Sequence, residues 1–83
     1  MKLVIDGAAL KVLLAMPEAD AAGLREKLKR FAADPTARHP WAKAFGGGTG
    51  RIRHGDWRAV YRIDGAVLTV FVVRIGNRKE VYR

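Results

Sequence analysis

Apolar residues recur at helical spacing in the first half of the chain. Three leucines at positions i, i+3 and i+4 predict a helix over about residues 8–16, which Pro17 ends. A wider apolar stripe with charged residues on its other side predicts an amphipathic helix over residues 18–33, ending before Asp34-Pro35. A short apolar run at residues 2–5 is typical of a strand, so the chain is expected to begin with a strand and a pair of helices.

The spacing of apolar residues changes to two in the second half, which is typical of strands whose two faces meet different environments. Residues 36–50 contain Pro40 and a run of glycines, so we expect a loop before these strands begin. Gly55-Asp56 and Asp64-Gly65 are turn signals, and Gly76-Asn77 is expected to break the sheet once more. The predicted strands cover residues 51–53, 57–63, 66–75 and 80–83.

The order of these elements predicts an α+β fold. A strand and two helices come first, and hairpin-linked strands follow, giving the order β-α-α-β-β-β-β. Helices grouped in this way pack together on one face of a sheet. We therefore expect two N-terminal helices on one face of a mostly antiparallel sheet of four to five strands.

Composition narrows the classes of protein that fit this fold. The chain has 83 residues and no cysteine, so residues 1–83 are expected to form one small domain without disulfides, a thiolate zinc site or a cysteine nucleophile. With only two histidines, neither a metal site nor another cofactor is expected. The longest apolar run is far shorter than a membrane span, and the opening residues lack a secretory signal pattern. We expect a cytoplasmic protein with no membrane partner.

Positive charge is concentrated in the predicted sheet. Sixteen Lys and Arg residues stand against eight Asp and Glu, a net charge of +8. Residues 51–83 hold eight of the basic groups against three acidic ones, and seven of the eight are arginine. The planar guanidinium group binds phosphate well, so this bias favours a polyanionic partner. The alternative interpretation is a solvated surface on which acidic residues balance the arginines.

Strand alternation predicts where these arginines lie. Arg51 and Arg53 share one side of their strand, while Ile52 points to the other. On the next strand Arg58 and Arg62 lie opposite a large apolar set, which must be the buried one. The arginines are therefore expected on the sheet face that the helices leave uncovered, with Arg78 at its rim. Like charges gathered on a sheet face repel, so stability alone does not explain them.

Two segments of the second half resemble a known family. RIRHGDWRAVYRI at residues 51–63 and VFVVRIGNRKEVY at residues 70–82 resemble the RelE/ParE superfamily of bacterial toxin–antitoxin toxins, and the resemblance is closest to the RelE branch. It implies a ribosome-dependent endoribonuclease, or mRNA interferase, that cuts mRNA in the decoding site and is silenced by a cognate antitoxin. The implied partners are the antitoxin, the ribosome and mRNA, and no cofactor is implied.

The resemblance also implies roles for individual residues. Arg51 and Arg53 match the basic pair on the first strand after the helices, and Arg58 matches the arginine after the aromatic residue. Arg78 matches the basic residue after the glycine turn, and Tyr82 matches the C-terminal catalytic tyrosine. The candidate catalytic residues are therefore Arg58, Arg78 and Tyr82, and the candidate RNA-binding and phosphate-binding residues are Arg51, Arg53 and Arg62.

The proton acceptor is the open question in this set. RNA is cut without metal when its 2′-OH attacks the adjacent phosphorus, which requires a base, an acid and positive charge. Guanidinium groups stay protonated and are poor bases. The family often has lysine where this chain has Arg51 and Arg53. Tyr82 is a candidate base or a stacking group. His54 is expected to point away from Arg53, which suits a turn or surface role. Trp41 and Trp57 are expected to pack against the core.

Two other functions fit the same resemblance. A ParE-like protein would be a non-catalytic inhibitor of DNA gyrase, and such a protein would usually lack the arginine and tyrosine set found here. A degenerate member would only bind RNA or its antitoxin. Single replacements of Arg58, Arg78 or Tyr82 by Ala would separate these functions from an endoribonuclease.

Overall fold

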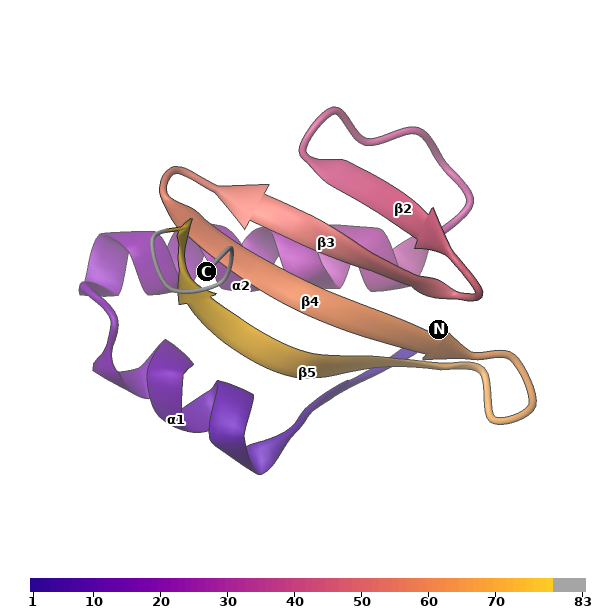
Figure 1. Ribbon diagram of the computed structural model, residues 1–83, viewed down its shortest axis with the longest axis horizontal. Coiled ribbons are helices and arrows are strands. Elements are labelled where there is room, and N and C mark those ends of the chain that lie inside the picture. Colours follow the sequence, from indigo (N-terminus) through magenta and orange to yellow (C-terminus); the bar gives the residue numbers. More distant parts are fainter. Residues whose placement is uncertain (79–83) are drawn as a thin grey trace.

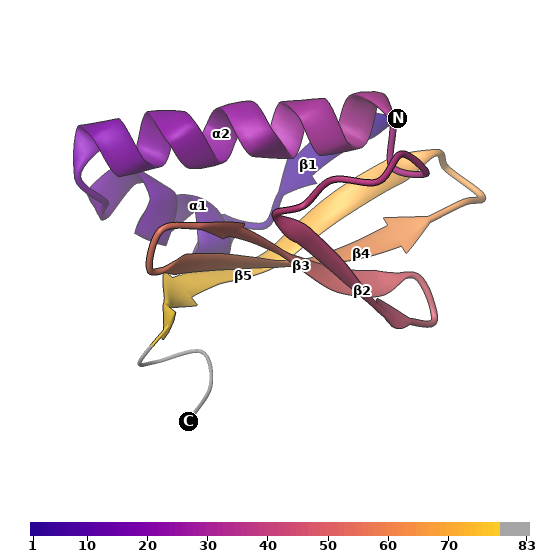
Figure 2. The ribbon, with the colours of Figure 1, turned by 90° about the horizontal axis from the view of Figure 1, so that it is seen from above.

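Two helices cover one face of a single sheet. The computed structural model describes residues 1–78, in which the sheet has the strand order β1-β5-β4-β3-β2 (Figure 1). Seen from above, α1 and α2 lie on the same side of the strands, which leaves the other face of the sheet open (Figure 2). The elements are β1 (Lys2–Ile5), α1 (Gly7–Ala15), α2 (Glu18–Ala33), β2 (Ala42–Gly46), β3 (Thr49–His54), β4 (Trp57–Asp64) and β5 (Thr69–Asn77).

Pairing within the sheet is mostly antiparallel. The β2–β3, β3–β4 and β4–β5 pairs are antiparallel, and β1 pairs with β5 in parallel. The helices connect β1 to β2, not to β5. Three antiparallel pairings make β5 run opposite to β2, and β1 also runs opposite to β2, so β1 and β5 are parallel. The predicted α+β class and the helix pair on one face of the sheet are confirmed.

The core lies between the helix pair and the sheet. Leu24 and Leu28 of α2 are fully buried, as is Ile52 of β3. On β5, Val70 and Val72 are also fully buried, because they lie on the face that the helices cover. Burial of these branched side chains is the main favourable term in folding such a small domain.

Within residues 1–78, no helix is long and apolar enough to cross a membrane.

Both helices match their predicted extents closely. Asp6 precedes α1, and its carboxylate accepts a hydrogen bond from the backbone N–H of Gly7 at 2.8 Å. A carboxylate at this position satisfies a helix N–H that would otherwise have no partner. Pro17 separates the two helices, because its ring removes a backbone donor and fits only at the start of the next helix.

The region predicted as a loop over residues 36–50 contains a strand, so that prediction was wrong. Ala42–Gly46 pairs with β3 and forms an edge of the sheet. Small residues obscure its alternation in the sequence, and tertiary pairing outweighs its weak strand preference. The glycines that follow turn the chain tightly, with φ angles of 95°, 62° and 77° at Gly46, Gly47 and Gly48. Those angles favour glycine.

Two predicted breaks in the strands were also wrong in detail. The β4–β5 connection spans residues 65–68 and is longer than a two-residue turn. Gly76 and Asn77 continue β5, where Asn77 pairs with Trp57. The strand predicted over residues 80–83 lies outside the described residues. Four strands follow the helices within the described residues. Three of them, β3, β4 and β5, correspond to predicted strands, and the fourth, β2, was not predicted.

Gly50 allows a close approach between two strands and a buried tyrosine. A Cβ atom at Gly50 would lie 2.5 Å from the carbonyl O of Lys43 and closer still to the hydroxyl of Tyr61. We expect Gly50→Ala to lower the free energy of unfolding by about 1–3 kcal/mol, because overpacking displaces backbone as well as side chain. Urea unfolding measures this change.

Gly65→Ala is the matched control for this substitution. A Cβ atom at Gly65 meets no atom within 4 Å, and its φ angle is not in the left-handed region. The control should change stability by less than about 0.5 kcal/mol. Equal destabilisation by the two variants would contradict the packing described around Gly50.

Candidate nucleic-acid interface

Basic side chains from several strands share the open face of the sheet. Residues paired in an antiparallel ladder project to the same face. Arg51 pairs with Lys43 on one side and with Val60 on the other, and Val60 pairs with Arg74. Ile52 next to Arg51 is fully buried under the helices, so this row projects from the uncovered face. We call the following residues the cationic face: Lys43, Arg51, Arg53, Arg58, Arg62 and Arg74.

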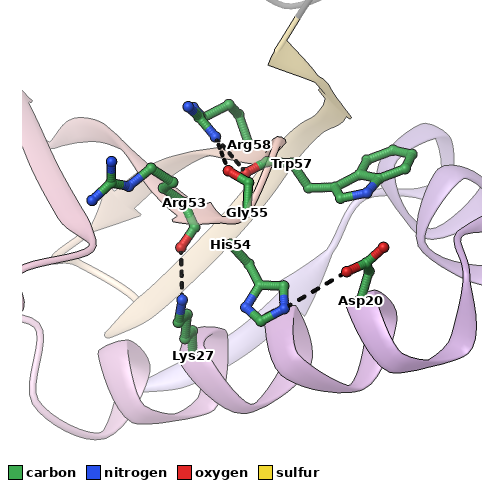
Figure 3. A network of polar contacts seen from close by, with 7 residues as sticks. All are labelled: Asp20, Lys27, Arg53, His54, Gly55, Trp57 and Arg58. Atoms are coloured by element: carbon green, nitrogen blue, oxygen red, sulfur yellow. Dashed lines mark hydrogen bonds and ion pairs between the residues drawn. The ribbon is translucent and has the colours of Figure 1, made fainter.

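Arg58 is the anchored member of the cationic face. It pairs with Arg53 across β3 and β4 and lies on the predicted face, yet it is only 8% exposed. Its Nη1 donates hydrogen bonds to the carbonyl O of Gly55 at 2.8 Å and to that of Trp57 at 3.1 Å (Figure 3). Bonds to two carbonyls of the β3–β4 turn hold the guanidinium group in place. The prediction gave its face correctly but not its burial.

Arg62 lies at the other end of β4 and is partly neutralised. Its guanidinium carbon lies 4.6 Å from the ring centroid of Phe71, which faces it across the ladder. Its Nη1 also lies 3.8 Å from the Oδ2 atom of Asp64. For Arg62, the interpretation of a basic residue balanced by an acidic neighbour therefore holds in part. A half-exposed pair of this kind contributes little to stability.

Arg78 lies beside the turn that anchors Arg58. Its backbone N–H donates to the carbonyl O of Asp56 at 2.6 Å, which brings the end of β5 to the β3–β4 turn. Its side chain is exposed. Arg53, Arg58 and Arg78 thus gather at one end of the sheet, where Figure 1 shows β5 ending beside that turn. Tyr82 lies outside the described residues.

Lys43 and Arg74 belong to the cationic face but were not predicted from the sequence. Lys43 lies on the unpredicted β2. Arg74 was hidden by a bulge, because Val60 pairs with Arg74 while the next residue of β4, Tyr61, pairs with Val72. The extra residue, Val73, reverses the alternation of β5 and turns Arg74 outward. The buried apolar residues of β5 are spaced by two at Val70 and Val72 and by three at Ile75. This change of spacing is the signal in the sequence that could have revealed the bulge.

The helix side of β3 carries a second set of polar groups. Lys27 of α2 donates from Nζ to the carbonyl O of Arg53 at 3.1 Å, and burial, Arg53 and Arg30 together lower the pKa of Lys27 (Figure 3). His54 Nε2 lies 3.9 Å from Asp20 Oδ1, on the opposite side of the strand from Arg58. The side of the strand predicted for His54 is therefore correct.

The two tryptophans pack against the core, as predicted. Trp41 precedes β2 and Trp57 begins β4, and both are partly buried against the hydrophobic cluster between helices and sheet. The ring of Trp41 also stacks with His39, with centroids 4.5 Å apart. Neither tryptophan belongs to the cationic face.

Comparison with known proteins gives a consistent family. A family model for the ParE toxin of the type II toxin–antitoxin system parDE matches residues 6–82. No curated protein sequence gives a significant match.

Solved structures similar to this chain include RelE toxins, alone and in complexes. The isolated RelE toxin of E. coli is 28% identical, with a TM-score of 0.79, and the match covers 98% of this chain and 89% of that one. A chain of the intact E. coli RelBE toxin–antitoxin complex is 25% identical, with a TM-score of 0.76 and coverage of 92% and 94%. A chain of the Mycobacterium tuberculosis RelBE2 complex is also 25% identical, with a TM-score of 0.74 and coverage of 93% and 96%.

Repulsion within the cationic face predicts a salt-dependent stability. We expect Arg53→Gln to raise the free energy of unfolding by about 0.2–1 kcal/mol at low ionic strength, because it removes a positive charge directly opposite Arg58. The gain should shrink towards zero near 1 M salt, where the Debye screening length is only about 3 Å. Urea unfolding at the two salt concentrations measures the effect.

Lys11→Gln on α1 is the control for a general loss of positive charge, since Lys11 is exposed on the helix layer. A stability gain of equal size in both variants would argue against repulsion within the cationic face. So would a gain for Arg53→Gln that persists at high salt.

Proposed function

Because this chain belongs to the ParE toxin family of type II toxin–antitoxin systems, and its fold is that of RelE toxins, we propose that it is a ribosome-dependent endoribonuclease that cuts mRNA. The cationic face is the observation that carries this proposal. An open sheet face with basic groups on β2, β3, β4 and β5 suits an RNA backbone better than a compact small molecule.

Residues of the cationic face, together with Arg78 at its end, are proposed to divide between holding the RNA and stabilising charge. Arg51 and Arg53 are proposed to bind backbone phosphates, with Arg62 extending the contact along β4. Arg58 and Arg78 are proposed to surround the scissile phosphate. The carbonyls that hold Arg58 fix its guanidinium group before the substrate arrives, so less reorganisation is needed when negative charge develops.

The proposed reaction needs no metal ion. The 2′-oxygen attacks the adjacent phosphorus, the bond to the 5′-oxygen breaks, and the products are a 2′,3′-cyclic phosphate and a free 5′-hydroxyl. A base accepts the proton of the 2′-OH, and an acid delivers a proton to the leaving 5′-oxygen. Arg58 and Arg78 stabilise the extra negative charge on the phosphorane oxygens during this transfer.

Tyr82 has two chemically distinct roles open to it in this scheme. As a base it would accept the 2′-OH proton. As a stacking group it would hold a nucleotide in line for attack. The arginines cannot serve as the base, because a guanidinium group remains protonated.

A cognate antitoxin is the proposed protein partner. Several of the similar solved structures are toxin–antitoxin complexes, including those of E. coli and M. tuberculosis. An acidic segment that covers the cationic face would block RNA and would be captured quickly through charge complementarity. Ribosomes and mRNA are the proposed targets of the free toxin, which places its action in the cytoplasm.

Inhibition of DNA gyrase is the second candidate function. The family model that matches this chain describes a ParE toxin, and this observation favours it. A gyrase inhibitor would act by binding alone, so it would not depend on the proposed catalytic residues. Variants of those residues therefore separate the two functions.

Replacement of Arg78 tests the proposed nuclease directly. Arg78 is exposed, so Arg78→Ala should leave the fold intact. We expect cleavage of mRNA in a purified translation system to slow by about 10²-fold, because one stabilising donor for the phosphorane is lost. Single-turnover rates measure this loss, with Lys11→Ala on the helix layer as the charge-matched control.

Gyrase supercoiling assays on the same variants complete this test. Full toxicity of Arg78→Ala, with supercoiling inhibited as strongly as by the unmodified chain, would contradict the nuclease and support the gyrase function. Equal slowing of cleavage by Arg78→Ala and Lys11→Ala would contradict the role given to Arg78.

Tyr82→Phe distinguishes proton transfer from stacking. Phenylalanine keeps the ring and removes the ionisable hydroxyl, so a stacking role predicts cleavage within a few-fold of the original rate. A base role predicts a loss of about 10²–10⁴-fold. Cleavage rates from pH 6 to 10 provide the second readout, since only a base gives a rising limb that Tyr82→Phe abolishes.

A further inference from the structure

A pocket lies at the edge of the sheet next to the cationic face. Its volume is about 360 Å³, and its lining includes Lys27 of α2, Trp41 before β2, and Arg53 of β3. Here β3 extends past the start of β2, and the N–H of Arg53 donates to the carbonyl O of Trp41 at 2.9 Å. The pocket therefore opens between α2 and the end of β3. We call it the Trp41 pocket.

Two basic side chains, Lys27 and Arg53, line the Trp41 pocket, and a third, Arg30, lies near the Trp41 ring. Lys27 Nζ lies 6.0 Å from the Trp41 ring centroid, and the guanidinium carbon of Arg30 lies 5.9 Å from it. Arg53 lines the pocket itself. Across residues 1–78, none of the ion pairs involves Lys27, Arg30 or Arg53. Cations gathered in this way repel one another, so an anion bound among them would relieve the repulsion.

Trp41 adds an aromatic surface to this group of charges. Its ring stacks with His39 at an interplanar angle of 25°, while Lys27 and Arg30 stand at the outer limit of cation–π contact. The ring is only partly buried and lines the pocket. An aromatic ring beside cations is the combination that binds single-stranded nucleic acid, because bases stack on the ring and phosphates meet the charges.

We propose that the Trp41 pocket binds a nucleotide of the RNA strand next to the one that is cut. The inference rests on the proposed function in taking RNA as the ligand. Arg53 belongs to both the cationic face and the pocket, so a strand bound along the face passes into the pocket at the end of β3. A nucleotide uses both features at once, because its phosphate meets the charges and its base stacks on the ring, which favours RNA as the occupant.

Binding of RNA to the isolated protein tests the pocket without ribosomes. In a Trp57→Phe background, Trp41 is the sole tryptophan and reports on its own pocket. A fully 2′-O-methylated single-stranded oligoribonucleotide, which cannot be cut by 2′-OH attack, should quench the fluorescence of Trp41. Lys27→Gln should weaken its binding about 3- to 10-fold and should lower the salt slope of log K by about 0.7, the value for one phosphate contact on a single strand.

Lys29→Gln is the matched control, since Lys29 is an exposed lysine on the same helix and the charge change is identical. It should leave the affinity and the salt slope unchanged, and Lys27→Arg should restore both. Thermal unfolding of each variant verifies that it is folded. Equal effects of Lys27→Gln and Lys29→Gln, or saturating RNA that leaves Trp41 fluorescence unchanged, would overturn the proposal.

Two parallel measurements separate this proposal from the proposed function. If the unmodified chain cuts translated mRNA while Lys27→Gln binds RNA normally, the pocket proposal fails and the nuclease stands. If the unmodified chain does not cut, the nuclease fails, and the oligoribonucleotide titration still decides whether the pocket binds RNA. If Lys27→Gln weakened binding of the antitoxin but not binding of the oligoribonucleotide, RNA would be overturned as the occupant.

Discussion

Burial of one sheet face under the helix pair determines where the charge of this protein can lie. Leu24 and Leu28 require apolar partners, and alternate residues of β3, β4 and β5 provide them. Alternation then leaves the basic residues on the other face, because a charged side chain under the helices would lose its hydration. The same constraint that builds the core therefore builds the cationic face. Its charges repel, so the face is a cost to stability that binding a polyanion would relieve.

Much of this arrangement could be predicted from the sequence. Helical spacing gave the two helices, and the alternation around Ile52 and Tyr61 placed Arg51, Arg53 and Arg58 on the open face. The remainder depends on contacts that no local pattern contains. Ala42–Gly46 becomes a strand only because β3 lies beside it, and the two carbonyls that anchor Arg58 are brought together by the folded turn.

The bulge in β5 shows how one residue changes the chemistry of a face. A strict alternation through β5 would bury Arg74 with Val70 and Val72, which a single extra residue avoids. The insertion keeps Ile75 in the core and sends Arg74 to the open side. The match to the isolated E. coli RelE toxin shows that this chain shares the fold of that toxin. The proposed nuclease needs that face accessible, and an antitoxin would act by covering it.

Mapping of cut sites on a translated mRNA tests the central claim most directly. The purified chain is added to an mRNA with and without ribosomes, and primer extension locates the new 5′ ends. If the cationic face binds and cuts mRNA on the ribosome, discrete cuts should occur at ribosome-occupied codons and be absent from the same mRNA without ribosomes. Intact mRNA under both conditions, from a chain that still arrests growth, would contradict this account.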